Sequence, residues 1–174
     1  MVPGEPLFHN EICIEHLKQA EEERRRGRDP RPSLERATNA AREAVKVAPK
    51  RGEGHSNLGE ALWKRADYQR HRGGDPMPDA RAAEAAFNQA LELLPDHPTI
   101  RLYLATLHTL VARVELDQGR DPQPLLAVAA AAIDRVLARN PREAGARECR
   151  DEIHALRGRW QARQLGGAAP DPVK

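Results

Sequence analysis

Between residues 53 and 72, small and apolar side chains recur at the three- and four-residue spacing that places them on one face of a helix. Leu58, Leu62 and Ala66 carry this face, with Gly59 beside it, and polar residues occupy most of the positions between them. An amphipathic helix buries such a face against a partner and leaves the other face in water. The pattern therefore predicts a helix of about 20 residues that packs against a second element.

The second element follows directly in the sequence. The glycines at 73–74 end the first helix, because glycine readily adopts the left-handed conformation that closes a helix. Asp75 then offers a carboxylate to the next helix start, which is predicted near Pro76 because a proline in the first turn loses no intrahelical hydrogen bond. This helix runs to Leu94, where Pro95 ends it. We call the two antiparallel helices of such a unit helix A and helix B.

The same unit occurs three times. The turn between helix A and helix B has the sequence Gly-x-Asp-Pro-x-Pro, and successive turns place Asp29, Asp75 and Asp121 at steps of 46 residues. The prolines that end helix B keep the same 46-residue step at Pro49, Pro95 and Pro141. A fixed period that extends over whole units is the sequence signature of a helical repeat protein.

Both helices repeat their inward-facing side chains. Small or apolar residues of helix B stand at spacings of four and three residues, as Ala37, Ala41 and Ala44; Ala83, Phe87 and Ala90; and Ala129, Ile133 and Val136. The corresponding helix A residues are Ile12, Cys13 and His16; His55, Leu58, Gly59 and Leu62; and Leu104, Ala105 and His108. This pattern resembles the tetratricopeptide repeat family over about residues 7–163. In that family the small residue of helix A, here Cys13, Gly59 or Ala105, lets helix B approach closely.

The repeat is longer than the usual tetratricopeptide unit. The family repeat has about 34 residues, so that the 46-residue step leaves about 12 more, which we assign to extra helical turns on both sides of the Gly-x-Asp-Pro-x-Pro turn. A long variant with this turn is similar to repeats found beside bacterial serine/threonine kinase domains. The kinase signature itself does not occur in this sequence.

The resemblance implies an all-α fold, a right-handed superhelical solenoid of antiparallel helix hairpins with about seven helices. The predicted segments are an N-terminal extension at 1–6, repeats at 7–52, 53–98 and 99–144, a capping helix at 145–164 and a disordered tail at 165–174. The capping helix has an apolar stripe formed by Cys149, Ile153, Leu156 and Trp160. Its polar face is expected to turn five arginines toward water, namely Arg147, Arg150, Arg157, Arg159 and Arg163.

Composition and charge narrow the functional classes. Aromatic residues make up 3% of the chain, so that alanine and leucine must provide most of the packing. A net charge of +2 in 174 residues is small for a dedicated nucleic-acid-binding domain. Cys13 and Cys149 match no metal or redox spacing, and the reduced, buried thiols that this predicts favour a cytoplasmic protein. Neither a signal peptide nor a stretch of about 20 apolar residues occurs, so that secretion and membrane insertion are not expected.

No motif in the sequence predicts catalysis or a cofactor. It contains no nucleophile elbow, phosphate-binding glycine loop, paired-cysteine motif or carboxylate pair of the kind that enzymes use. His9 and His16 are two helical turns apart, which is too far for one metal coordination shell, and His55 and His108 stand at packing positions. We therefore expect a non-catalytic protein that holds neither a cofactor nor a metal.

The densest run of charges lies between Glu21 and Arg26. The pairs Glu21 with Arg25 and Glu22 with Arg26 have the four-residue spacing of ion pairs on an exposed helix face. An alternative function is RNA binding by a basic tip that consists of Arg24, Arg25, Arg26, Arg28 and Arg31. This run lacks the aromatic residues that stack on single-stranded bases, so that nucleic-acid binding is not the favoured hypothesis.

The favoured hypothesis is a protein–protein interaction scaffold that binds a peptide or a partner protein along successive A helices, where this fold usually holds its ligands. Aligning the repeats places eleven residues on this concave groove: Asn10, Ile14, Leu17, Lys18, Ser56, Glu60, Trp63, Lys64, Leu102, Thr106 and Thr109. Trp63 is a candidate anchor for the partner, because a large flat side chain buries much area at a small entropic cost. The alternative that Trp63 packs inside its long hairpin stays open.

The sequence also suggests what could bind. Lys18 and Lys64 flank Trp63 in the alignment and favour an acidic partner. Self-association through the N-terminal hairpin is a second possibility, since Leu7, Phe8 and Ile12 have no preceding repeat to cover them. The resemblance to kinase-linked repeats suggests a further alternative, a regulatory fragment of a multidomain bacterial serine/threonine kinase.

Overall fold

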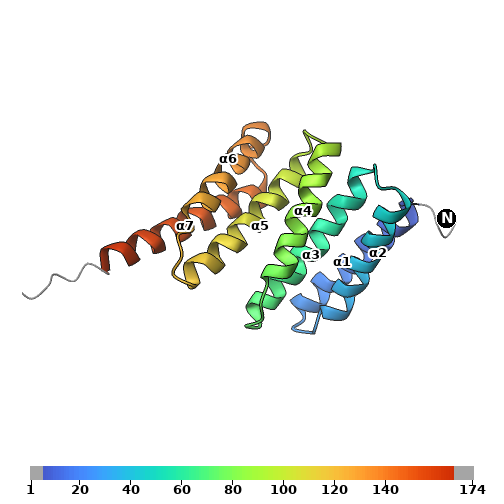
Figure 1. Cartoon of the computed structure of the whole chain (residues 1–174), viewed down its shortest axis with the longest axis horizontal. Helices are drawn as coiled ribbons and strands as arrows, with labels where there is room; N and C mark the ends of the chain where they lie inside the picture. The colour runs from blue at the N-terminus through green and yellow to red at the C-terminus, as the bar shows by residue number, and fades with distance from the viewer. Residues whose placement is uncertain (1–5, 167–174) are drawn as a thin grey trace, which may run out of the picture. The chain divides into compact units, whose positions relative to one another are not determined.

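The computed structural model describes residues 6–166, and these residues form seven α-helices and no strand (Figure 1). The helices are α1 (Pro6–Arg25), α2 (Arg31–Val47), α3 (Gly52–His71), α4 (Met77–Leu93), α5 (Pro98–Asp117), α6 (Gln123–Arg139) and α7 (Ala144–Gly166). The predicted all-α fold and the number of helices are confirmed. None of the helices in this part of the chain is long and apolar enough to cross a membrane.

The helices end as the glycine pattern predicts. Gly27, Gly73 and Gly119 have positive φ angles of 68°, 75° and 77°, and they are the positive-φ residues of the described chain. At the end of α1, the N–H of Gly27 donates to the carbonyl of Arg24 at 3.0 Å, and the N–H of Arg28 donates to the carbonyl of Glu23 at 2.7 Å. This pair of hydrogen bonds is a Schellman motif, and α3 and α5 end with the same pair.

The aspartates of the turns start the next helices. Asp29, Asp75 and Asp121 each accept a hydrogen bond from the backbone N–H two residues ahead, at 3.0, 2.9 and 2.9 Å. The proline that follows each aspartate already has a helical φ angle, between −83° and −80°. The predicted helix start is therefore confirmed. Helix α4 ends at Leu93, one residue earlier than predicted, because the backbone of Leu94, which precedes Pro95, leaves the helical region with φ −134° and ψ 70°.

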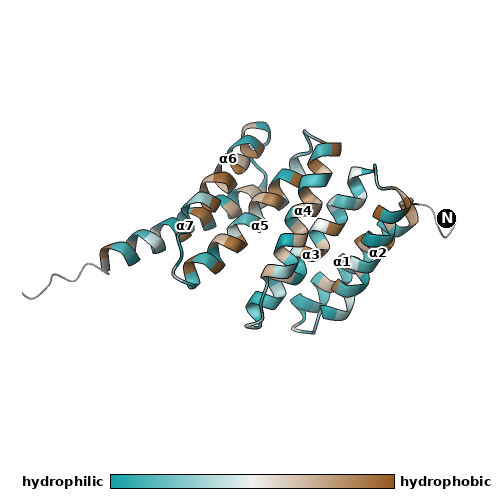
Figure 2. Ribbon diagram, viewed as in Figure 1, coloured by the Kyte–Doolittle hydropathy of each residue, from teal (hydrophilic) through white to brown (hydrophobic). Residues whose placement is uncertain are grey.

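All nine residues predicted to face inward from the three B helices, Ala37 to Val136, are at most 4% exposed. The small residues Cys13, Gly59 and Ala105 of the A helices are also buried. Phe87 of α4 packs so closely on Gly59 of α3 that a Cβ atom at Gly59 would lie 2.5 Å from its ring. Small residues thus permit the close approach of helix A and helix B that the repeat pattern implies. Hydrophobic and hydrophilic residues alternate along the helices (Figure 2).

The described chain divides into two compact units, and the boundary between them in the sequence falls within α5, after Tyr103. In the first unit α1 packs against α2 and α3, and α3 packs against α2 and α4 (Figure 1). In the second unit α6 packs against α7, while the Cys149 thiol of α7 lies 3.5 Å from the hydroxyl of Thr109 on α5.

Helix α7 differs from the prediction at its C-terminal end and on its polar face. It includes Leu165 and Gly166, which were predicted to belong to a disordered tail; residues 167–174 of that tail, like residues 1–5 of the extension, lie outside the described residues. Of the predicted stripe, Cys149, Ile153 and Leu156 are buried, and Trp160 is half-buried. Some arginines do more than face water: Arg157 and Arg163 donate to the carbonyls of Leu126 and Leu116, and Arg159 pairs with Asp117.

A charge at an inward position of helix B should destabilise the first unit. We expect Ala83→Glu to lower the free energy of unfolding by several kcal/mol, because Ala83 is 0% exposed and a carboxylate there would lose its hydration. Urea denaturation followed by circular dichroism measures this effect. The matched control is Ala82→Glu at the neighbouring exposed position, and equal midpoints for the two variants would contradict the assignment of faces.

The contact between Gly59 and Phe87 gives a second expectation. Replacing glycine by alanine within a helix normally stabilises it by up to about 1 kcal/mol, and Gly158→Ala in α7, where a Cβ meets no atom within 4 Å, should do so. Gly59→Ala should instead destabilise by about 1–3 kcal/mol, because the buried Phe87 ring must move. Phe87→Leu should recover part of this loss in the double variant. The measurement is thermal unfolding of the wild type, Gly158→Ala, Gly59→Ala and the double variant Gly59→Ala/Phe87→Leu. A Gly59→Ala protein that is more stable than the wild type would show that the Phe87 ring can move without an energetic cost.

Candidate functional site

A groove lies on the first unit where α1, α3 and the start of α5 meet. It has a volume of about 470 Å³, within the range of about 300–1,000 Å³ found for ligand pockets. We call it the α1–α3 groove. Its lining residues are Ile14, Leu17, Lys18, Glu21, Glu22, Arg25, Glu60, Lys64 and Tyr103.

Five of the eleven residues predicted to line a groove are found here: Ile14, Leu17, Lys18, Glu60 and Lys64. Ile14, which is 41% exposed, and the buried Leu17 are the aliphatic side chains of its lining. Their arrangement follows from helix geometry, because residues 14, 17, 18, 21 and 25 are three or four positions apart and share one face of α1.

The other predicted residues are placed differently. Asn10 is buried and accepts a hydrogen bond at 3.1 Å from the side chain of Asn57, which joins α1 to α3. Ser56 and Leu102 are half-buried and do not line the groove. In the second unit, Thr106 is half-buried, and the buried Thr109 donates its hydroxyl to the carbonyl of Ala105 at 2.9 Å.

Trp63 lies next to the groove and is not one of its lining residues. Its half-buried ring packs on Tyr103, with ring centroids 5.6 Å apart, and the Lys64 ammonium lies 5.3 Å from the centroid of the Trp63 ring. Phe87 contacts the Tyr103 ring as well, at 6.1 Å between centroids. Tyr103 is thus the aromatic residue that lines the groove, and the Trp63 ring packs against it.

The repeat alignment did not select Tyr103, Glu21, Glu22 or Arg25. Tyr103 is adjacent to the aligned position Leu102, and the only signal for it is that aromatic residues are rare in this chain. The three residues of α1 continue the stripe that begins at Ile14 and Lys18. Extending that stripe by two helical turns would have included them.

One of the ion pairs around the groove joins α1 to α3, and the others lie within a single helix or at its end. The Lys64 ammonium lies 3.5 Å from the Glu21 carboxylate and 3.8 Å from the Glu60 carboxylate. The pair predicted between Glu21 and Arg25 is therefore wrong, because Lys64 of α3 attracts Glu21. Glu22 pairs with Arg26, as predicted, and also with Arg25, each at 2.5 Å.

Burial raises the pKa values of Glu60, Tyr103 and Cys13. Desolvation raises the pKa of Glu60, and the nearby Glu21 raises it further, against the opposing effects of Lys64 and of a hydrogen bond from Tyr103. The pKa of Tyr103 rises to about 12 through burial and the Glu60 charge. The same two causes raise the pKa of the Cys13 thiol to about 12. Cys13 therefore stays a protonated, unreactive thiol at neutral pH.

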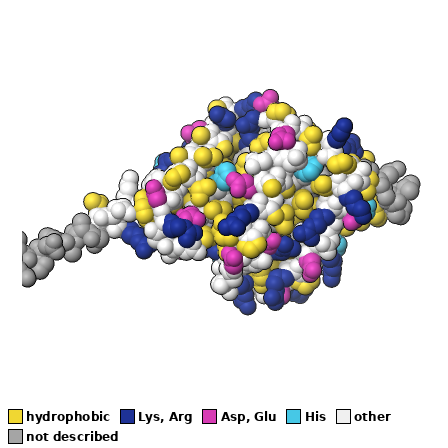
Figure 3. Space-filling view, viewed as in Figure 1, with side chains coloured by type: hydrophobic (Ala, Val, Ile, Leu, Met, Phe, Trp, Pro, Cys, Tyr) yellow, Lys and Arg dark blue, Asp and Glu magenta, His cyan; other side chains and the backbone are white. Residues whose placement is uncertain are grey.

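The arginines of the predicted basic tip are largely paired with carboxylates. Arg24 pairs with Asp67 of α3 at 3.0 Å, and Arg31 binds Asp29 at 2.7 Å, in addition to the pairs of Arg25 and Arg26 with Glu22. On the face shown in Figure 3, basic and acidic side chains are interspersed. These pairs reduce the positive field that a polyanion such as RNA would encounter.

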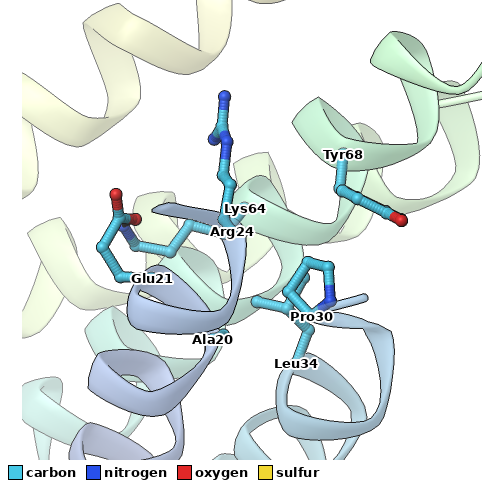
Figure 4. Close-up of a pocket in the computed structure, with 7 residues that line it drawn as sticks. All are labelled: Ala20, Glu21, Arg24, Pro30, Leu34, Lys64 and Tyr68. Atoms are coloured by element: carbon cyan, nitrogen blue, oxygen red, sulfur yellow. Dashed lines mark ion pairs between the residues drawn. The ribbon is translucent and has the colours of Figure 1, made fainter. Parts of the chain in front are cut away.

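A second cavity, shown in Figure 4, lies beside the first turn. It is lined by Ala20, Glu21, Arg24, Pro30, Leu34, Lys64 and Tyr68. Its volume of about 10 Å³ is at the lower limit of the space that one water molecule needs, so that it is too small for a ligand. Within residues 6–166, no group of three or more His, Cys, Asp or Glu side chains is arranged to hold a metal ion.

Comparison with known proteins finds no protein-family model that matches the chain and no curated protein with a significant match.

The Glu60 carboxylate should make stability fall as pH rises. The folded chain binds a proton at Glu60 up to a higher pH than the unfolded chain does, because the pKa is raised in the fold. Between the ordinary value of 4.5 and the raised value, the free energy of unfolding therefore decreases with pH, by about 1.4 kcal/mol for each unit of separation. Glu60→Gln should remove this decrease and unfold at a higher urea concentration than the wild type at pH 7.

Urea titrations from pH 4 to pH 8 provide the measurement. Glu11→Gln on the exposed face of α1 is the control and should keep the wild-type profile. A Glu60→Gln protein that is less stable than the wild type at pH 7 would show that the Lys64 and Tyr103 contacts outweigh the burial of the charge.

Proposed function

We propose that this protein is a non-catalytic protein–protein interaction scaffold that binds a peptide or a segment of a partner protein in the α1–α3 groove. The observation that carries the proposal is the groove itself. It is an open depression of about 470 Å³ in which the exposed side of Ile14 and the aromatic Tyr103 lie among charged residues. Partly exposed apolar and aromatic side chains surrounded by polar ones are the usual composition of a protein-binding surface.

We further propose that the hairpins belong to a tetratricopeptide-like, right-handed superhelical solenoid. The support is the same helix-ending and helix-starting turn at Gly27, Gly73 and Gly119, and the burial of the nine aligned helix B positions. In such an array the A helices lie next to each other, as α1 and α3 do in the first unit. The groove then occupies the surface on which helical repeats present their ligand-binding residues.

The chemistry of the groove favours binding over catalysis. Its carboxylates are committed to Lys64, Tyr103, Arg25 and Arg26, and the nearest thiol, Cys13, is buried with a pKa of about 12. The two cysteines are free and buried, which fits the reducing cytoplasm as the site of action. RNA binding finds less support, because four of the five tip arginines already pair with carboxylates.

Two variants of matched exposure test the groove. Ile14 and Val47 are 41% and 43% exposed, but only Ile14 lines the groove, since Val47 lies at the end of α2. We expect Ile14→Asp to weaken binding of a captured partner tenfold or more, about 1.4 kcal/mol, and Val47→Asp to leave it unchanged. The measurement is affinity capture from the source lysate, followed by titration of the identified partner.

Circular dichroism first establishes that both variants fold. A partner that binds the wild type and Ile14→Asp equally well would place the binding surface elsewhere. The self-association suggested by Leu7, which is 54% exposed, is measured on the same samples by light scattering.

A further inference from the structure

Two exposed apolar side chains lie on one face of α1. Leu7 is 54% exposed and Ile14 is 41% exposed, and their positions are two helical turns apart, so that both point to the same side. Phe8 and Ile12, which the sequence analysis grouped with Leu7, are half-buried, and Ile12 packs on the core that α1 forms with α2 and α3. The open apolar surface of α1 is therefore the side that carries Leu7 and Ile14.

Two charged side chains continue this surface. Glu11 and Lys18 are exposed, and they stand three residues before and four residues after Ile14, which places them on the same side of the helix. We call Leu7, Glu11, Ile14 and Lys18 the α1 face. Lys18 lies 3.9 Å from Glu15 of its own helix, at the outer limit of an ion pair, and the two side chains are 71% and 76% exposed. The Lys18 ammonium is therefore able to pair with a second carboxylate.

The order of the charges along the α1 face is self-complementary. In an antiparallel pair of α1 helices whose two-fold axis passes between residues 14 and 15, the two copies of Ile14 lie side by side at the centre. Residue 11 of one copy is then opposite residue 18 of the other, because the two positions are equally far from the axis. Each Glu11 carboxylate thus faces a Lys18 ammonium, and this pair occurs twice. A parallel arrangement would instead place like charges opposite each other.

The last member of the α1 face meets aliphatic groups in the same arrangement. Leu7 falls opposite Glu22 of the other copy, because these two positions are also equally far from the axis. The Glu22 carboxylate already pairs with Arg25 and Arg26, each at 2.5 Å. The aliphatic stems of these paired side chains can cover Leu7. One antiparallel arrangement thus pairs the charges of the α1 face and covers its apolar residues.

We propose that the α1 face is a self-association surface, through which two copies of this chain pair as an antiparallel dimer with two-fold symmetry. Because Ile14 and Lys18 also line the α1–α3 groove, the second copy covers part of that groove. The dimer therefore presents less of the groove to a partner than the monomer does. The self-association itself does not depend on the proposed function, since it requires no other protein.

Charge reversal at the two positions tests the arrangement. Glu11→Lys and Lys18→Glu each place like charges opposite each other at both pairs of the dimer, so that two attractive contacts become repulsive. We expect either variant to raise the dissociation constant of the dimer at least about tenfold. An equimolar mixture of the two variants should restore the dimer, because both pairs of the mixed dimer again join opposite charges. The measurement is sedimentation velocity over a series of protein concentrations, after circular dichroism has shown that each chain folds.

Glu43→Lys and Lys46→Glu are the matched controls, since they reverse the charges of an exposed pair on α2, outside the α1 face. Neither control should change the association. A wild-type chain that stays monomeric at every concentration would overturn the inference. A dimer that neither α1 variant weakens, or a mixture that associates no more than its two components, would overturn it as well. Each of these results leaves the proposed function standing, because the groove is tested separately with a partner.

Discussion

The close approach of helix A to helix B through small side chains is the constraint on which the rest of the structure depends. Gly59 lies under the ring of Phe87, and the buried alanines at 37, 41, 44, 83 and 90 permit the same kind of contact elsewhere in the first unit. Because alanine contributes little apolar area, many such contacts at short distance must replace the few large contacts of an aromatic core. This close packing fixes the rotation of each helix about its axis. It thereby decides which residues of α1 and α3 face the groove.

The sequence was sufficient for the features that depend on neighbouring residues. Gly73 closes α3 and Asp75 starts α4 through contacts with residues at most five positions away, so that their roles could be predicted from the turn motif. The buried face of each B helix could be predicted from the four- and three-residue spacing of its small and apolar side chains. The pairing of Glu21 with Lys64 could not be predicted in this way, since 43 positions separate them and the competing Arg25 is one helical turn away. The relation of Tyr103 to Trp63 and Glu60 similarly requires the packing of three helices.

The candidate site shows how packing alters the meaning of a charged residue. Lys64 was expected to attract an acidic partner, but the carboxylates of Glu21 and Glu60 already lie within 4 Å of its ammonium. Trp63 was considered either as an anchor for a partner or as a packing residue, and the structure places its ring against Tyr103 and outside the groove lining. The surroundings of Lys64 and Trp63 thus depend on residues of adjacent helices, Glu21 of α1 and Tyr103 of α5.

The turns have one more consequence, which concerns the order in which the chain acquires its structure. The Schellman bonds and the aspartate bonds around Gly27 join residues no more than five positions apart, and those around Gly73 and Gly119 do the same. Each turn can therefore form as soon as its own hairpin has left the ribosome, before the following repeat is made. Local contacts of this kind favour rapid folding. In the first unit the hairpin of α1 and α2 is synthesised before α3, which packs against both of its helices, so that this hairpin exposes the covered face until α3 has been made.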